Sequence, residues 1–170
     1  MKKLVLLTVL SLPLSAFSHV TIDTNNDVAG GYAKLTFRVP HGCDGSSTTK
    51  ITVQLPEGTL SVKPQVHYGW TITTKEEKLK KPVSMHGHSI TETTTEVSWS
   101  GGPLPDKYMD EFGMVVKLPE HSGKIFFPVV QECEKGVSKW IEIGNAEAKL
   151  PAPGFELKIA PKQEEHHHNH

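Results

Sequence analysis

Short segments in which every second residue is apolar recur along the chain. In the first of them Leu35, Phe37 and Val39 alternate with polar residues, which is the signature of a strand with one buried face. The segments are residues 34–40, 50–56, 89–100, 112–119, 124–133 and 155–161. No stretch carries a helical repeat longer than two turns, so the pattern predicts an all-β protein.

Turn-forming residues separate these segments. They lie at residues 29–31, 56–58, 100–106 and 151–154. Seven or more short strands with regular turn signals predict an antiparallel β-sandwich of immunoglobulin-like type with about seven to nine strands. A closed barrel is the alternative.

The first 18 residues have the features of a secretory signal peptide. Lys2 and Lys3 precede an apolar run over residues 4–14, and Ala16 and Ser18 occupy the −3 and −1 positions of a cleavage site. The run is too short to span a bilayer, and no later segment approaches the ~20 apolar residues of a membrane helix. We therefore expect an exported, periplasmic protein with one domain over residues 19–161 and no transmembrane segment after cleavage.

The remaining composition bears on partners and on the C-terminus. The formal charge is −1, and it becomes −3 once Lys2 and Lys3 are removed, so neither nucleic acid nor an anionic membrane is an expected partner. Residues 162–170 are expected to form a disordered tail. Its histidines are a native metal-gathering string or, alternatively, a cloning scar; they are His166, His167, His168 and His170.

The chain has two cysteines, Cys43 and Cys133. In an exported protein an even pair predicts a disulfide. A dithiol copper(I) site is the alternative, although neither cysteine belongs to a CxxC motif.

Cleavage after Ser18 makes His19 the first residue of the mature chain. Its α-amine and imidazole Nδ1 can then close a six-membered chelate on one metal ion. Such nitrogen pairs favour copper(II), which stands at the top of the divalent affinity order. The amine has a reference pKa of about 7.7 to 8.0, so the metal displaces only a weakly held proton. The alternative is an exposed terminal histidine without a ligand role.

Three further motifs accompany this histidine. "HVTI" opens the mature chain, and "GGPLPDKYMDEFGMVVKLP" and "FFPVVQECEKGVSKW" follow in that order. Together they resemble the YcnI-like family of exported copper-binding domains, from His19 to about Pro161. The resemblance implies an immunoglobulin-like sandwich that holds one tight copper(II) ion in a brace made by a single N-terminal histidine. It also implies a glutamate and a nearby tryptophan in the site, which map onto Glu111 and Trp140.

The residues themselves leave alternatives open at these positions. Alternation with Phe112 places Glu111 on the outer face of its strand, where it can be a surface carboxylate, and Asp110 competes with it for the ligand role. Trp140 can equally be a core residue, as we expect for Trp70 and Trp99. Cleavage after Ala16 would place His19 third and give a copper(II) site of an amine, two backbone amides and the ring, with no need for Glu111.

A second cluster of possible ligands is the "SMHGHS" segment. It holds Met85, His86 and His88 on an expected loop, and the thioether suits copper(I). The alternative is a polar loop with incidental histidines.

These observations predict a copper(II)-binding protein of copper homeostasis, a metallochaperone or buffer, that is not an enzyme and exchanges copper with another exported protein. Two other functions remain open. One is a copper-dependent oxidoreductase, which a carboxylate ligand disfavours because it opposes cycling to copper(I). The other is a metal-independent immunoglobulin-like module that binds a protein of the cell envelope.

Overall fold

The computed structural model describes residues 19–145 and 147–159, and every regular element in these ranges is a β-strand. The strands are β1 (Thr21–Thr24), β2 (Tyr32–Val39), β3 (Thr48–Gln54), β4 (Leu60–Pro64), β5 (Trp70–Met85), β6 (His88–Leu104), β7 (Asp110–Lys117), β8 (Gly123–Phe126), β9 (Val129–Cys133), β10 (Val137–Trp140) and β11 (Gly154–Leu157). The expected signal peptide and C-terminal tail lie outside the described residues. Within the described residues no helix is long and apolar enough to cross a membrane.

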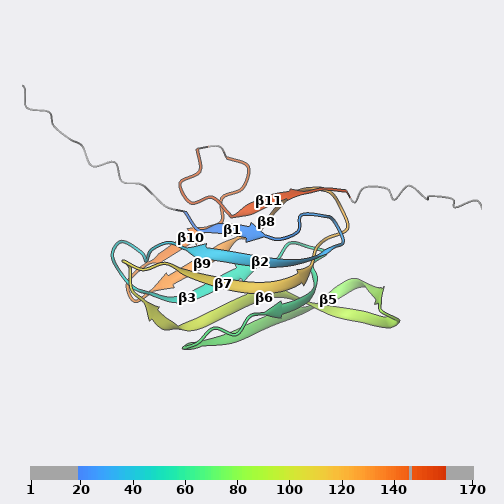
Figure 1. Cartoon of the computed structure of the whole chain (residues 1–170), viewed down its shortest axis with the longest axis horizontal. Helices are drawn as coiled ribbons and strands as arrows, with labels where there is room; N and C mark the ends of the chain where they lie inside the picture. The colour runs from blue at the N-terminus through green and yellow to red at the C-terminus, as the bar shows by residue number, and fades with distance from the viewer. Residues whose placement is uncertain (1–18, 146, 160–170) are drawn as a thin grey trace, which may run out of the picture.

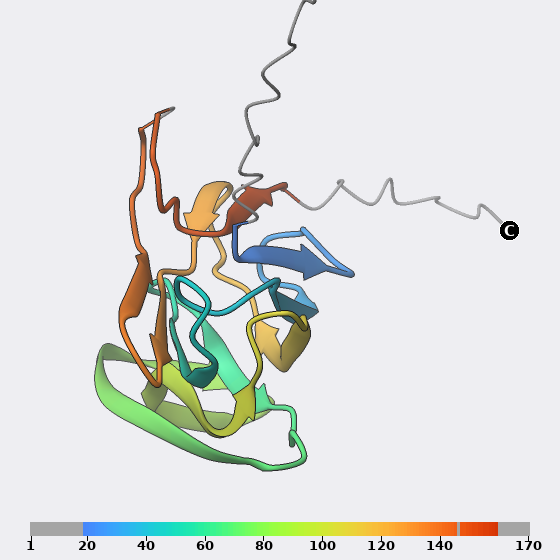
Figure 2. The same cartoon turned by 90° about the vertical axis from the view of Figure 1, so that its left-hand side faces the viewer.

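Two antiparallel sheets form the sandwich that the pattern predicts. One has the order β1-β2-β7-β4 and the other β10-β9-β3-β6-β5, and β11 pairs with β8 in a small separate ribbon. Figure 1 shows the sheets along their strands, with the β5–β6 hairpin reaching beyond the rest of the sandwich. Figure 2 shows them from one end, with the connection between β10 and β11 projecting away from both.

The core lies where the alternating residues of the two sheets meet. In β2 the residues Leu35, Phe37 and Val39 are fully buried while their neighbours face outward, as the period of two requires. Trp99 of β6 is also fully buried, and Trp70 of β5 packs edge-on against Phe112 with ring centroids 4.9 Å apart. Both tryptophans are therefore packing residues, as expected.

Two strand boundaries differ from those that the sequence pattern predicts, and proline and glycine residues account for them. Residues 124–133 form two strands, β8 and β9, because Pro128 between them has no N–H to donate to a ladder. The turn expected from residue 100 onward begins later, since β6 continues through Gly101 and Gly102 to Leu104. A Cβ at Gly101 would lie 2.2 Å from the Gly69 carbonyl oxygen, so the glycine permits close strand contact instead of a turn.

The predicted disulfide is present between Cys43 and Cys133. It joins the connection between β2 and β3 to the last residue of β9, across 90 positions of sequence. The pair is thus a covalent cross-link rather than a dithiol metal site.

Replacing both cysteines by alanine is expected to lower the free energy of unfolding by about 4 to 5 kcal/mol, because a closed loop of this length restricts the unfolded chain. Urea unfolding of the oxidised protein and of the double variant measures the difference. Wild-type protein unfolded in reductant should match the variant. Equal midpoints for all three samples would contradict the cross-link.

Candidate metal centre

His19 lies two residues before the start of β1, with its ring against the indole of Trp140. The two ring centroids are 5.8 Å apart in an edge-to-face arrangement of 64°. The next residue, Val20, is 2% exposed and anchors the chain in the core, so the backbone at His19 is held. The structure therefore brings together the first and last members of the set His19, Glu111 and Trp140.

Trp140 is the last residue of β10 and is only 3% exposed. Its indole Nε1–H donates a hydrogen bond of 3.0 Å to Oε1 of Gln131, which is itself completely buried. The amide of Gln131 in turn donates to the backbone oxygen of His41 at 2.7 Å and to Oγ1 of Thr48 at 2.8 Å. The Trp140 ring is thus fixed in place, and both the nitrogen and the oxygen of the buried Gln131 amide have hydrogen-bond partners.

Sequence reasoning missed two residues of this end, His41 and Gln131. The His41 ring lies 6.4 Å from the Trp140 ring, also edge-on, and its Nδ1 is 2.6 Å from the Gly42 carbonyl oxygen. Gln131 lies at a core-facing position of β9, where the alternation would place an apolar residue. A polar residue at such a position indicates a buried hydrogen bond. His41 lies in a connection, and no pattern indicated it.

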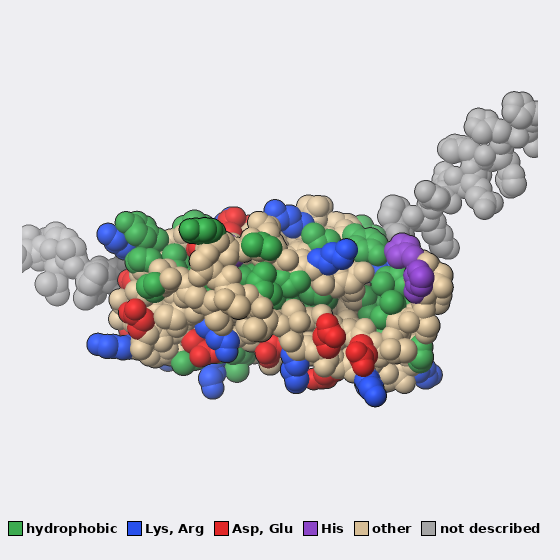
Figure 3. All heavy atoms as spheres, turned by 90° about the horizontal axis from the view of Figure 1, so that it is seen from below, with side chains coloured by type: hydrophobic (Ala, Val, Ile, Leu, Met, Phe, Trp, Pro, Cys, Tyr) green, Lys and Arg blue, Asp and Glu red, His purple; other side chains and the backbone are tan. Residues whose placement is uncertain are grey.

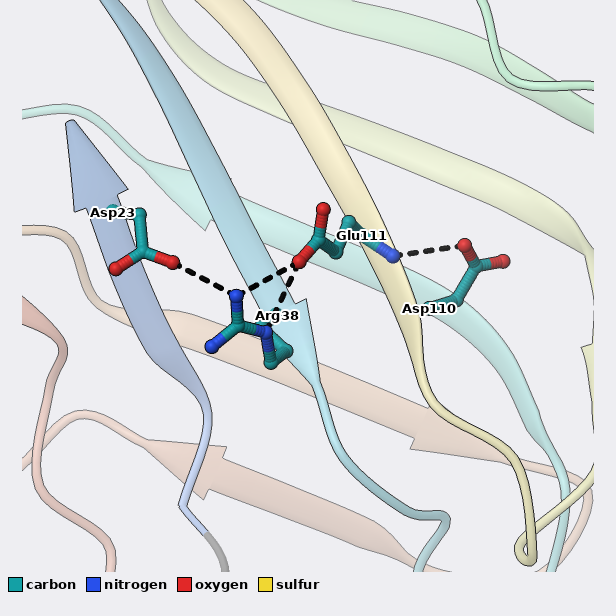
Figure 4. Close-up of polar contacts among 4 residues, drawn as sticks. All are labelled: Asp23, Arg38, Asp110 and Glu111. Carbon is teal, nitrogen blue, oxygen red and sulfur yellow. Dashed lines mark hydrogen bonds and ion pairs between the residues drawn. The ribbon is translucent and has the colours of Figure 1, made fainter. Parts of the chain in front are cut away.

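Glu111 is exposed on the outer face of β7, as the alternation predicts, but its partner is Arg38 on the neighbouring strand (Figure 4). Nε and Nη2 of Arg38 both lie 3.0 Å from Oε1 of Glu111, and Nη2 is also 3.0 Å from Oδ2 of Asp23. One guanidinium therefore holds two carboxylates from β1 and β7. Glu111 makes no ion pair with His19.

Asp110, the competing carboxylate, is occupied as well. Its Oδ1 accepts the backbone N–H of Glu111 at 2.8 Å, and its Oδ2 is 2.9 Å from Nε2 of His67. Across the part of the chain that the structure describes, no three histidine, cysteine, aspartate or glutamate side chains converge on one point. Neither carboxylate therefore belongs to a pre-formed cluster of metal ligands around His19.

The other predicted ligands lie elsewhere. Met85, His86 and His88 form the tip of the β5–β6 hairpin, where Nε2 of His86 is 3.0 Å from the phenol oxygen of Tyr32. The four histidines of the tail lie outside the described residues.

A hollow of about 450 Å³ lies at the root of that hairpin rather than at His19. It has no histidine or cysteine in its lining, and Nζ of Lys80 is 2.8 Å from Oε1 of Glu57 there. The hydrogen bond from Lys80 lowers the pKa of Glu57. The hollow offers charged surface groups but no set of metal ligands.

Replacing Gln131 by leucine is expected to lower the free energy of unfolding by about 2 to 4 kcal/mol, because it removes the acceptor of the buried Trp140 N–H and the donor to the buried Thr48 hydroxyl. Urea unfolding measures the loss, and near-ultraviolet circular dichroism reports the altered indole. Gln54→Leu, at an exposed position of β3, is the control and should change stability by about 0.5 kcal/mol or less. Equal effects of the two substitutions would contradict a structural role for the Gln131 amide.

Comparison with solved structures supports the fold. An uncharacterized protein from Nocardia farcinica, described as having an immunoglobulin-like fold, superimposes with a TM-score of 0.65 at 26% identity, covering 82% of this chain and 97% of that one. The second type II cohesin module of the ScaA scaffoldin of Acetivibrio cellulolyticus gives a TM-score of 0.37 at 14% identity, covering 85% of this chain and 91% of the module. The superposition on the Nocardia farcinica protein, together with the two antiparallel sheets, confirms the sandwich of immunoglobulin-like type.

One family model matches nearly all of the described chain. No curated protein matches it. The model described as "Domain of unknown function (DUF1775)" matches residues 19–157, beginning at the histidine that contacts Trp140. The match agrees with the resemblance to YcnI-like proteins, and the chain belongs to the DUF1775 family.

Proposed function

We propose that this chain is an exported copper(II)-binding protein of copper homeostasis, which carries or buffers one tightly held ion per molecule. The observation that carries the proposal is the contact between His19 and Trp140, at a ring separation of 5.8 Å. This contact positions the imidazole ring of His19, which is the N-terminal residue when the chain is cut after Ser18. The amine and Nδ1 of this one residue then supply two nitrogen ligands for the copper cargo.

The Trp140 indole has two roles in this proposal. It limits the orientations of the His19 ring, which reduces the entropy lost when the chelate closes. It also covers one side of the site with an apolar surface, because the ring is almost fully buried and its N–H is already bonded to Gln131.

Glu111 can join the ion in competition with Arg38, which holds its Oε1. Both side chains of this ion pair are more than 40% exposed, and exposed pairs contribute only about 0 to 1 kcal/mol, so the exchange costs little. Asp23 remains on Arg38 when Glu111 leaves, so the guanidinium keeps a partner. We propose that copper(II) competes with Arg38 for this carboxylate and that the mature protein passes the ion to or from another exported, periplasmic copper protein. A cargo role rather than catalysis fits a carboxylate ligand, which opposes cycling to copper(I).

Substituting His19 by alanine is expected to abolish the tight copper(II) equivalent, because both the ring and its placement against Trp140 are lost. Adding one residue before His19 should do the same, because it moves the amine. Electron paramagnetic resonance of the processed protein, titrated with copper(II), counts the nitrogen ligands. His121→Ala, at an exposed histidine between β7 and β8, is the control. Tight 1:1 binding that survives both changes at residue 19 would refute the proposal.

Substituting Arg38 by alanine is expected to strengthen copper(II) binding about fivefold, which is about 1 kcal/mol, because Glu111 is released from its competing partner. A competition titration with a copper(II) chelator measures the change. Lys34→Ala removes the same charge from an outward position of β2 without touching Glu111. If both variants shift the affinity equally, the effect is general electrostatics and Glu111 is not a ligand.

Copper(II) is expected to quench the fluorescence of Trp140, because the ion would be bound by the histidine that contacts this ring. In Trp140→Phe most of the copper-dependent quenching should disappear, although Trp70 and Trp99 still emit. Trp70→Phe is the matched control. Quenching that is lost in the control variant instead would place the ion elsewhere.

A further inference from the structure

The β5–β6 hairpin ends in a tight turn that brings three possible metal ligands together. Met85 and His88 are paired directly across the two strands, and His86 and Gly87 form the two-residue turn between them. Directly opposed residues of an antiparallel pair carry their side chains on one face, with Cβ atoms about 5 Å apart. The thioether of Met85 and the ring of His88 are therefore neighbours.

His86 adopts a backbone conformation that side chains rarely take. Its φ is 51° and that of Gly87 is 80°, as a hairpin turn with two left-handed residues requires. Such a conformation costs a residue other than glycine about 1 kcal/mol or more, and asparagine is the usual choice at this position. His86 is exposed, so burial of its ring in the core does not offset that cost.

His86 is oriented by its contact with Tyr32, the first residue of β2. The two rings stack with centroids 6.4 Å apart and an angle of 21°. Nε2 of His86 is 3.0 Å from the phenol oxygen, and the phenol hydroxyl donates to Sδ of Met85 at 3.9 Å. In the tautomer with the proton on Nε2, that N–H donates to the phenol oxygen, the hydroxyl donates to the sulfur, and the lone pair of Nδ1 is left for another partner.

Histidines that bind metals with one nitrogen usually hydrogen-bond through the other, and that bond orients the ring. The Tyr32 phenol makes a bond of this kind to Nε2 of His86. Here the same phenol also holds the thioether of Met85. Histidines gather at this end of the molecular face shown in Figure 3, over the tip of the hairpin. Met85 also borders a hollow of about 210 Å³ whose lining includes Glu76 and Glu92, two negative charges that favour a cation.

We propose that Met85, His86 and His88 form a second metal site, for a soft monovalent cation of the copper(I) type, with Tyr32 as its positioning residue. A thioether with two imidazoles is a soft donor set that selects copper(I) over hard divalent ions. No carboxylate is bonded to any of the three side chains in the described structure.

This site goes beyond the function proposed for His19, because the two lie at opposite ends of β2. Tyr32 begins that strand, whereas Arg38, near its other end, is paired with Thr21 just after His19. At about 3.3 Å per residue the two ends are about 20 Å apart. One ion cannot be shared between them, and either site can fail without the other.

The test is an anaerobic titration of the full chain with copper(I), in competition with a chromophoric copper(I) chelator. The tail histidines are replaced by asparagine in every sample so that they add no background. The triple variant Met85→Leu, His86→Asn, His88→Thr should lose one copper(I) equivalent and keep the copper(II) spectrum of His19. The substitutions preserve fold, because asparagine suits the turn at position 86 better than histidine does and leucine keeps the volume of Met85.

Single variants identify the ligands. Met85→Leu and Tyr32→Phe are each expected to weaken copper(I) binding by about tenfold or more, and Met85→Leu should leave zinc(II) binding unchanged. His121→Asn and Met109→Leu, which remove an exposed imidazole and an exposed thioether elsewhere, should have no effect. An unchanged copper(I) equivalent in the triple variant would overturn the proposal. Equal losses in the two control variants would also overturn it.

Discussion

The buried amide of Gln131 is the contact on which the end of the sandwich around His19 depends. It accepts the indole N–H of Trp140 from β10 and donates to the His41 carbonyl in the connection between β2 and β3, so one side chain joins three separate parts of the chain. The disulfide lies two residues further along β9 and ties the same connection covalently. The ring that contacts His19 is therefore held by its burial in the core, by the hydrogen bond to Gln131 and by a strand neighbour that the disulfide fixes.

Two acidic residues near this end, Asp23 and Glu111, are ion-paired with the same arginine. Arg38 lies between Asp23 and Glu111 on three adjacent strands, so the group carries a net charge of −1 instead of −2 (Figure 4). This arrangement stabilises the empty protein because two like charges are separated by a positive one. It also keeps a carboxylate close to the surface in a form that an incoming cation can compete for. Under the proposed function, Glu111 is thus a metal ligand that becomes available without a pre-formed acidic cluster.

Much of the sandwich could be predicted from the sequence, because strands with one buried face carry their period of two in the residues themselves. β2 and β7 are examples, with inward Phe37 and Phe112 at the expected positions. β5 could not be predicted in this way, since it is exposed along nearly all its length and has no apolar alternation. His19 was singled out by its place after the expected signal cleavage, and Trp140 by a family motif. The Arg38 partner of Glu111 was not, because a cross-strand register is a property of the folded sheets.

The long free side of β5 has a consequence for how the protein behaves at high concentration. β5 is an edge strand of its sheet, and the unpaired N–H and C=O groups along the free side of its sixteen residues would ordinarily invite another chain to add a strand. The middle of β5 instead carries four lysines and a proline: Lys75, Lys78, Lys80, Lys81 and Pro82. Charged side chains, lysine especially, make an edge strand a poor partner for another strand, and the proline interrupts the row of donors. β5, which is exposed along nearly all its length, is thus protected against the addition of another strand.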